Sequence, residues 1–445
     1  MAGALGTKRW GPNAGEGGYG LGPVVTQLQL PHSVQIDGQA ARRGLIPRMP
    51  PGDRLLAGVE TWLRADYADQ VRATVQRTVG EGQTELYVSL HPAAPDLLMM
   101  ATDSGRLRVV AETAAAGPGY HRFVGRLLER MADSAGIGWS AEEPDRFAFA
   151  ERAVVERAYM GWLGPSLGRA RDALRRGARS QLGLPEGTRY LFDGAIATAL
   201  GPRDEAWLTA AIADPRVAVD VAPWWADAPD ARYLLNRALA LMWVHVRWRR
   251  PAVDGEAGLL DDVHRLLTKA YTTDPELPFP WHAWMDLVSN GGFDDGMTRQ
   301  VIARAAALPP PDVLVGYRRR SVRITHEGWS LEIPGEFAER RTPEEWWGGG
   351  PGRQVTLAAV PTGSMSAAAF VDPFAADLGR DALTHQAGDL VGKARILTDP
   401  SSGLEVAVLD GYSAVPGSGA AIRIEFDDAS HWQWAIDLWR SLAPG

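Results

Sequence analysis

Cysteine is absent from the 445-residue chain. This absence excludes disulfide bonds, catalytic thiolates and every zinc or iron–sulfur site that needs a cysteine ligand. It is compatible with a cytoplasmic protein, although many secreted bacterial proteins also lack cysteine.

Long apolar runs are missing too. No stretch of about 18 consecutive apolar residues occurs, so the sequence predicts no transmembrane helix. The first residues, MAGALGTKRWGPNAGEGGYGLG, contain no apolar core of the length that a signal peptide needs. We therefore predict a cytoplasmic protein without a membrane partner.

The chain also lacks an excess of positive charge. Lysine and arginine total 46 against 54 aspartates and glutamates, which gives a formal net charge of −8. Proteins that bind nucleic acid in general concentrate positive charge on one face. The acidic balance argues against nucleic acid as a partner.

Familiar catalytic motifs do not occur. The nine histidines are scattered, and the sequence contains no H-E-x-x-H pair, no G-x-S-x-G elbow and no Walker lysine loop. Asp261, Asp262 and His264 lie within one helical turn, where three such side chains do not converge on one ion. We predict no metal site and no cofactor.

Glycine and proline are abundant, with 49 and 31 residues, and they divide the chain. We predict a multidomain α+β protein with a small antiparallel α+β domain, a central all-helical domain with helical hairpins and a C-terminal antiparallel α/β sandwich. The predicted segments are a Gly/Pro-rich N-terminal arm over 1–52, the α+β domain over 53–143, the helical domain over 144–312 and the C-terminal domain over 313–445. Within the arm, VVTQLQL at 24–30 could form a short strand that docks elsewhere.

The α+β domain carries a hairpin signal and a helix signal. DLLMMAT and RLRVVAET flank Asp103-Ser104-Gly105, a favourable hairpin turn. Downstream, Val124, Leu127, Leu128 and Met131 have the spacing of one helical face. The two signals predict antiparallel strands with a helix covering one face.

Two regions resemble known families in layout. In LLTKAYTTDPELPFPW, Ala270 and Tyr271 precede Asp274-Pro275, and the hairpin over 231–280 resembles the second helix and closing turn of a tetratricopeptide repeat. GWSLEIP and the final strand followed by a helix are similar to the PsbP/Mog1 type of α/β sandwich. That second resemblance implies a fold whose members mostly bind other proteins.

The stretch GPGYHRFVGRLLERM, residues 117–131, leads from a predicted strand into a helix. Gly117 and Gly119 would let an anion approach the free N–H groups of the helix start, which makes them candidate anion-binding residues. If the protein is an enzyme, His121 is the candidate acid/base, with Tyr120 or Glu112 assisting. A structural turn is the simpler interpretation, because no complete phosphate-loop motif is present.

Tryptophan is unusually frequent, with 17 residues. Indole rings favour cores and interfaces, because each buries a large apolar area and carries an N–H group that needs a partner. The sequence EEWWGGGPG is a loop by composition, whose two rings either anchor a partner or pack onto their own domain. The candidate binding residues are Trp346, Trp347, Trp224, Trp225, Trp281 and Trp284.

Three function hypotheses result. The first is a non-enzymatic adaptor or scaffold subunit of a bacterial intracellular complex, such as a defence or assembly system, with other proteins as partners. The second is an enzyme of unfamiliar type that acts on an anionic small molecule at the corner formed by 117–121. The third is nucleic-acid binding through the arginine runs at 169–179, 246–251 and 317–320, where aromatic residues lie beside arginines.

Overall fold

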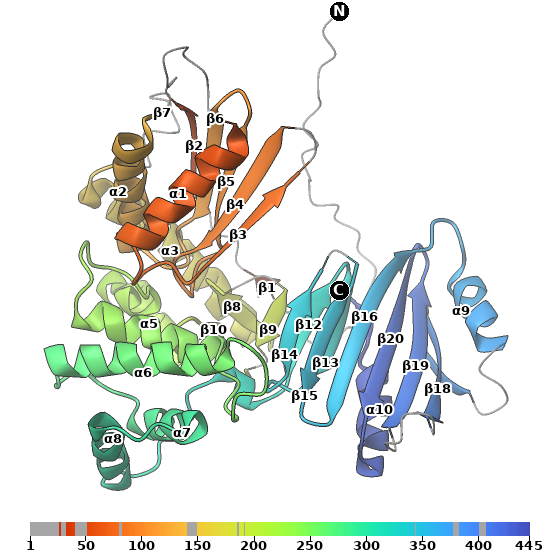
Figure 1. Ribbon diagram of the computed structural model, residues 1–445. Coiled ribbons are helices and arrows are strands. Elements are labelled where there is room, and N and C mark those ends of the chain that lie inside the picture. Colours follow the sequence, from red (N-terminus) through yellow and green to blue (C-terminus); the bar gives the residue numbers. More distant parts are fainter. Residues whose placement is uncertain are drawn as a thin grey trace, which may run out of the picture.

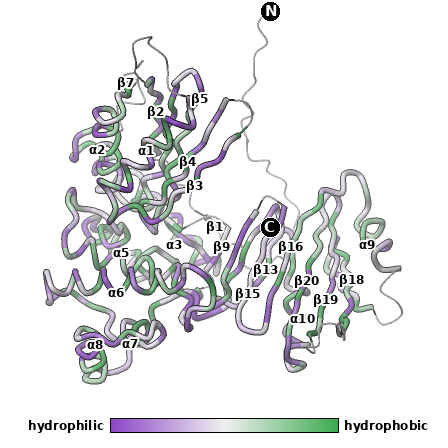
Figure 2. The backbone as a smooth tube through the Cα atoms, in the orientation of Figure 1, coloured by the Kyte–Doolittle hydropathy of each residue, from purple (hydrophilic) through white to green (hydrophobic). Residues whose placement is uncertain are grey.

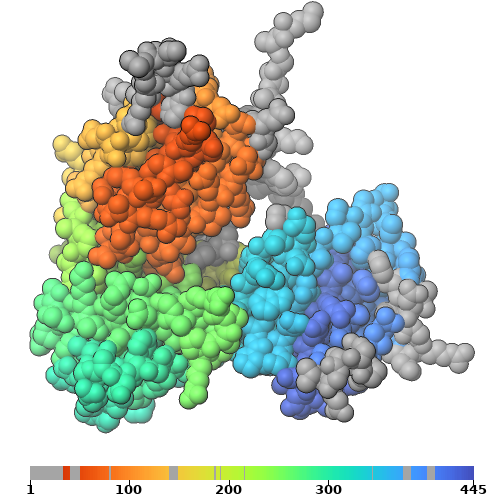
Figure 3. All heavy atoms as spheres, viewed as in Figure 1, coloured from red at the N-terminus to blue at the C-terminus, as the bar shows by residue number. Residues whose placement is uncertain are grey.

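The computed structural model describes residues 26–27, 33–40, 51–79, 82–139, 149–184, 187–190, 192–342, 344–376, 382–399 and 406–445. Helices and antiparallel sheets alternate along the chain, which confirms the predicted multidomain α+β class. Figure 1 shows an N-terminal sheet, a central group of helices and a C-terminal pair of sheets. The same three parts form the body of the molecule in the space-filling view of Figure 3.

The N-terminal sheet has six antiparallel strands in the order β3-β4-β5-β6-β2-β7. The strands are β2 (Ser33–Ala40), β3 (Ala73–Thr78), β4 (Gln83–Ser89), β5 (Leu97–Thr102), β6 (Arg106–Glu112) and β7 (Ile137–Trp139). Burial alternates along β4, β5 and β6, so one face is apolar. Helices α1 (Gly52–Asp66) and α2 (Pro118–Ala135) bury their own apolar sides with that face in one core.

Strand β2 lies within the segment that the sequence predicts as an arm. It pairs with β6 and with β7 and is therefore an internal strand of the sheet. Farther upstream, β1 (Thr26–Gln27) pairs in parallel with a strand of the central region, as the VVTQLQL stretch suggested. The rest of 24–30 lies outside the described residues.

The central region is built mainly from helices, as predicted. These are α3 (Arg152–Arg175), α4 (Glu205–Ala213), α5 (Ala231–Val244), α6 (Glu256–Thr273), α7 (Trp281–Gly291) and α8 (Gly296–Ala306), together with the 3₁₀ helix η2 (Pro215–Val221). Helices α5 and α6 pack side by side, as do α7 and α8. Their apolar sides share one core, as neighbouring amphipathic helices require.

The central region is not all-helical, however. Four short strands interrupt it, namely β8 (Ser180–Leu182), β9 (Thr188–Tyr190), β10 (Ala195–Thr198) and β11 (Gly201–Asp204). The prediction missed them because a strand of three or four residues is too short to show a two-residue period. Three of them join β1 in a small sheet, while β9 pairs with the C-terminal strand β12 (Val322–His326).

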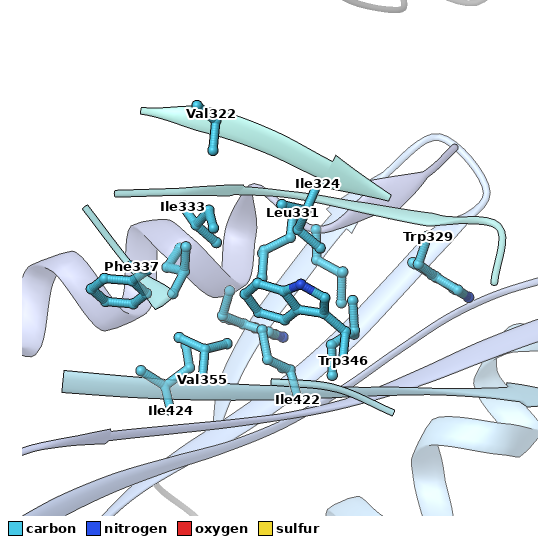
Figure 4. Close-up of a cluster of buried hydrophobic side chains, with 14 of the residues drawn as sticks. Val322, Ile324, Trp329, Leu331, Ile333, Phe337, Trp346, Val355, Ile422 and Ile424 are labelled. Carbon is cyan, nitrogen blue, oxygen red and sulfur yellow. The ribbon is translucent and has the colours of Figure 1, made fainter. Parts of the chain in front are cut away.

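The C-terminal region stacks two antiparallel sheets, in agreement with the predicted sandwich. One sheet has the order β21-β13-β12-β9 and the other the order β14-β15-β16-β20-β19-β18-β17. The remaining elements are η3 (Tyr317–Arg319), β13 (Trp329–Ile333), β14 (Ala338–Arg341), β15 (Trp346–Gly350), β16 (Arg353–Pro361), α9 (Ala367–Ala376), β17 (Leu383–Ala387), β18 (Leu390–Asp399), β19 (Val406–Val415), β20 (Ser418–Phe426), η5 (Ala429–His431), α10 (Trp432–Arg440) and β21 (Ala443–Pro444). Figure 4 shows Ile324 and Leu331 facing Val355 and Ile422 across the interior.

The apolar interior does not stop at the border between the central and C-terminal regions. Tyr190 and Trp243 belong to the same buried cluster as the sandwich core, and the ring of Tyr317 lies 4.9 Å from each of theirs. In Figure 2, hydrophilic and hydrophobic residues are interspersed along the tube in all three regions. The central and C-terminal regions therefore share one hydrophobic core.

Candidate functional site

The Gly-Pro-Gly corner before α2 packs against the segment that follows η2. Gly117 has φ 109° and ψ 177°, a conformation that is essentially restricted to glycine. A Cβ atom on Gly117 would lie 2.7 Å from the carbonyl oxygen of Trp224, and one on Gly119 would lie 2.3 Å from that of Ala226. The two glycines thus make room for a neighbouring backbone.

Backbone hydrogen bonds hold that contact together. Gly119 donates its N–H to the carbonyl oxygen of Trp224 at 3.1 Å, and Trp224 donates its own N–H to Ala116 at 2.8 Å. The donor that Gly119 would offer to an anion is therefore already used. We assign the corner a structural role in place of the anion site considered at Gly117 and Gly119.

The three candidate catalytic side chains of this corner differ in burial. Tyr120 and His121 are buried, with 0% and 2% exposure, whereas Glu112 is exposed at the end of β6. His121 Nδ1 lies 2.9 Å from the hydroxyl of Thr113 in the interior. Tyr120 and His121 are therefore enclosed in the interior, where neither side chain is open to solvent.

The six candidate tryptophans divide into two groups. Trp224, Trp284 and Trp346 are fully buried and belong to cores, so in this structure they present no surface to a partner. Trp225, Trp281 and Trp347 are half-buried. Trp346 and Trp347 lie in strand β15, not in a loop, and Figure 4 shows the Trp346 indole between the two sheets.

Two of the arginine runs meet inside the protein at Glu339. Arg318 Nη2 lies 2.5 Å from the Glu339 carboxylate and Arg247 Nη2 lies 3.6 Å from it. Trp346 donates its indole N–H to the same carboxylate at 3.1 Å. Burial alone would raise the pKa of Glu339, but attraction to Arg318 and Arg247 outweighs burial and lowers the pKa to about 2.

Other arginines of these runs are paired as well. Arg249 lies 2.7 Å from Glu256, and Arg319 lies 2.6 Å from Asp286. In the 169–179 run, Arg175 lies 2.6 Å from Glu205. These guanidinium groups form ion pairs within the protein. The three arginine runs therefore do not present a continuous free basic face to phosphates.

Exposed apolar residues gather where the chain leaves α8 and enters the C-terminal region. Leu308, Val313 and Leu314 are 45%, 46% and 51% exposed. They line a cavity of about 280 Å³ together with Trp281, Pro309 and Pro311. We call these six residues the linker surface. Large contiguous apolar patches on the surface of monomeric soluble proteins often mark interaction sites.

Positive charge borders the linker surface at both ends. The Arg304 guanidinium lies 6.0 Å from the ring of Trp281, and that of Arg320 lies 5.1 Å from the ring of Phe192. Phe192 and Arg320 line a second cavity of about 230 Å³, which shares Leu314 with the first. The exposed Asp312 also lines this second cavity. The arrangement is an apolar centre with a mainly basic rim.

Comparison with known proteins gives no family for this chain. No protein-family model matches the sequence, and no curated protein matches it. One solved structure with local similarity is a protein from Bacteroides thetaiotaomicron VPI-5482, at 8% identity and a TM-score of 0.24, which covers 26% of this chain and 45% of that one. The tetratricopeptide and PsbP/Mog1 likenesses therefore remain resemblances of layout.

Two further features bear on function. Within the described ranges, no three histidine, aspartate or glutamate side chains are grouped so that they could hold a metal ion. None of the helices in those ranges combines the length and apolar content needed to cross a bilayer.

A cavity of about 590 Å³ lies on the N-terminal sheet near Met100 and Arg106, and its Arg108 is already paired with Asp37 at 2.7 Å.

Of the six residues of the linker surface, sequence reasoning singled out only Trp281. Pro309–Pro311 marked a boundary, but composition alone does not show whether the neighbouring Leu308 and Val313 fold inward. A usable signal was present, since the exposed stretch 307–314 contains only one charged residue, Asp312.

Proposed function

We propose that the protein is a non-enzymatic adaptor or scaffold that docks a partner protein on the linker surface, as a subunit of a bacterial cytoplasmic complex. The observation that supports this function is the exposure of Leu308, Val313 and Leu314 around an apolar cavity. Apolar anchors that enter pockets supply most of the binding energy at protein interfaces.

The rim indicates the chemistry of the partner. Arg304 and Arg320 flank the apolar centre, and Asp312 is the one acidic residue lining either cavity. Opposite charges at an interface speed encounter and fix orientation. The partner that fits best is a protein segment with one or two large apolar side chains flanked by acidic residues.

The expected result of Val313→Asp is a loss of partner binding by at least about tenfold, because a buried carboxylate would face the apolar anchor. Val253→Asp is the matched control, since Val253 is also a loop valine and is 42% exposed against 46% for Val313. Co-purification from native lysate, followed by titration of the recovered partner, measures the difference.

Three outcomes decide the proposal. Recovery of the same partner by wild type and Val253→Asp, but not by Val313→Asp, supports it. Equal recovery by all three proteins contradicts docking at the linker surface. If light scattering shows a wild-type dimer that Val313→Asp converts to a monomer, a second copy covers the surface and the adaptor proposal is wrong.

A further inference from the structure

A group of aromatic and basic side chains is buried where the N-terminal sheet meets α5. The rings of His91, Tyr120 and Trp224 are mutual neighbours, with centroid separations of 5.7, 6.0 and 5.9 Å. Tyr233 of α5 packs on Trp224 at 4.3 Å. Arg237, one turn farther along α5, is 5% exposed, and the three rings are at most 1% exposed.

Four polar atoms of this group have no hydrogen-bond partner among the residues that the structure describes. They are His91 Nε2, Tyr120 Oη, Trp224 Nε1 and Arg237 Nε. Buried polar groups are nearly always paired, with protein or with an ordered solvent component. Four unpaired atoms in one buried group are therefore candidates for contact with a bound species.

All four atoms are donors. The indole and guanidinium N–H groups can donate hydrogen bonds but cannot accept them, and a tyrosine hydroxyl also donates readily. For His91 the tautomer follows from its other nitrogen, since Ala93 donates its backbone N–H to His91 Nδ1 at 3.2 Å. The single proton of the neutral ring is then on Nε2. Burial first, and then the neighbouring Arg237, lower the pKa of His91 well below its usual value, so the ring is neutral.

The group also carries a buried positive charge whose printed hydrogen-bond partners are both neutral. Arg237 donates from Nη1 to the Tyr233 hydroxyl at 3.0 Å and from Nη2 to the carbonyl oxygen of Gln70 at 3.2 Å, and both partners are neutral. Among the described residues, no carboxylate forms an ion pair with Arg237. Asp96 and Arg72 lie nearby, but both are exposed. A buried charge without a counter-ion is costly.

We propose that His91, Tyr120, Trp224 and Arg237 form a binding site for a small monovalent anion of halide size. A water molecule would accept only two of the four protons and would add two donors of its own, whereas an anion accepts from every side and neutralises Arg237. The site is independent of the linker surface. Its residues come from the β4–β5 connection, α2, the segment after η2 and α5, so the anion holds the N-terminal sheet against the central helices.

Thermal unfolding of the full chain in chloride and in gluconate, at equal ionic strength, tests the proposal. Wild type is expected to unfold about 2–4 °C higher in saturating chloride, because a ligand that binds only the folded state stabilises it. Tyr120→Phe removes one donor with almost no change in volume and is expected to reduce the shift, and Arg237→Gln to abolish it. Tyr159→Phe, at another tyrosine that is 4% exposed, is the control and should keep the shift.

A crystallographic measurement gives a second readout that does not depend on the variants. In crystals of the full chain soaked in bromide, an anomalous peak within hydrogen-bonding distance of Arg237 Nε and Tyr120 Oη is expected. Ordered water there without anomalous signal would overturn the proposal. Identical unfolding temperatures of the wild type in chloride and gluconate would do so as well. Because neither measurement involves a partner protein, either failure leaves the adaptor proposal untouched.

Discussion

Replacing Glu339 by glutamine is expected to lower the free energy of unfolding by about 3–5 kcal/mol. Glutamine has nearly the same shape, but it leaves Arg318 and Arg247 without a counter-ion. Arg318 is only 5% exposed, so water cannot take over the role of the carboxylate. The loss is large because an unpaired buried charge costs more than the intact pair contributes.

Urea unfolding followed by tryptophan fluorescence measures this effect. Glu336→Gln is the matched control, because Glu336 also pairs with an arginine, Arg353 at 2.9 Å, but its side chain is 36% exposed. An exposed pair of this kind contributes about 0–1 kcal/mol. Equal losses for the two variants would show that the buried ion pairs of Glu339 with Arg318 and Arg247 contribute no more to stability than an exposed pair does.

The effect of Glu339 also depends on pH in a defined direction. Its pKa in the folded protein is about 2, below the ordinary 4.5, so its charged form stabilises the folded state. The stabilisation is fully present above pH 4.5 and is lost as the pH falls toward 2. The difference in unfolding free energy between wild type and Glu339→Gln should therefore shrink across this interval.

Gly117→Ala is expected to cost about 2–6 kcal/mol. About 1–3 kcal/mol comes from forcing a side chain into a backbone conformation restricted to glycine. A further cost of about 1–3 kcal/mol comes from overpacking, since the new methyl group would lie 2.7 Å from the Trp224 carbonyl oxygen and 2.8 Å from Ala222 Cβ. Both contacts belong to a buried segment that has no room to move.

A second glycine separates these two contributions. Gly194 also has a positive φ, 74°, but nothing lies within 4 Å of the position where its Cβ would be. Gly194→Ala is therefore expected to cost only about 1–2 kcal/mol, from backbone strain alone. The comparison uses midpoints of thermal and urea unfolding. If Gly117→Ala is no worse than Gly194→Ala, the close packing of the corner on Trp224 is not what holds α2 in place.

Local signals in the sequence identified several elements correctly. Asp103, Ser104 and Gly105 join β5 to β6 as a tight turn, and Gly105 has φ 75°. The spacing of Val124, Leu127, Leu128 and Met131 predicted a helix that buries those residues, and α2 does so. Such predictions succeed because turn geometry and the helical period are set by neighbouring residues.

The WWGGG sequence shows how composition can mislead. Three glycines predicted a loop, yet Trp346–Gly350 is strand β15. A Cβ atom on Gly348 would lie 2.2 Å from the Trp346 indole, and one on Gly349 would lie 2.6 Å from that of Trp347. Each glycine leaves space on its own face of the strand for the ring two residues earlier. This requirement for space is visible only after the rings are placed.

The sequence does not show which residues, distant along the chain, come together in the fold. His91, Tyr120 and Arg237 come from three elements widely separated along the chain, and the GPGYH stretch that singled out Tyr120 does not link it to His91 or Arg237. Glu339 likewise has no local pattern that links it to Arg247 and Arg318. Their roles depend on tertiary packing, which no period or turn residue encodes.

Strand β9 makes chain order and spatial order differ. Residues 188–190 pair with 322–324, so the C-terminal sandwich includes a strand that precedes it by more than a hundred positions. A fragment starting at residue 313 would leave the backbone groups of 322–324 uncovered, and an uncovered edge of this kind recruits strands from other molecules. The smallest portion of the chain that retains an intact sandwich therefore begins upstream of β9 and carries the central helices with it.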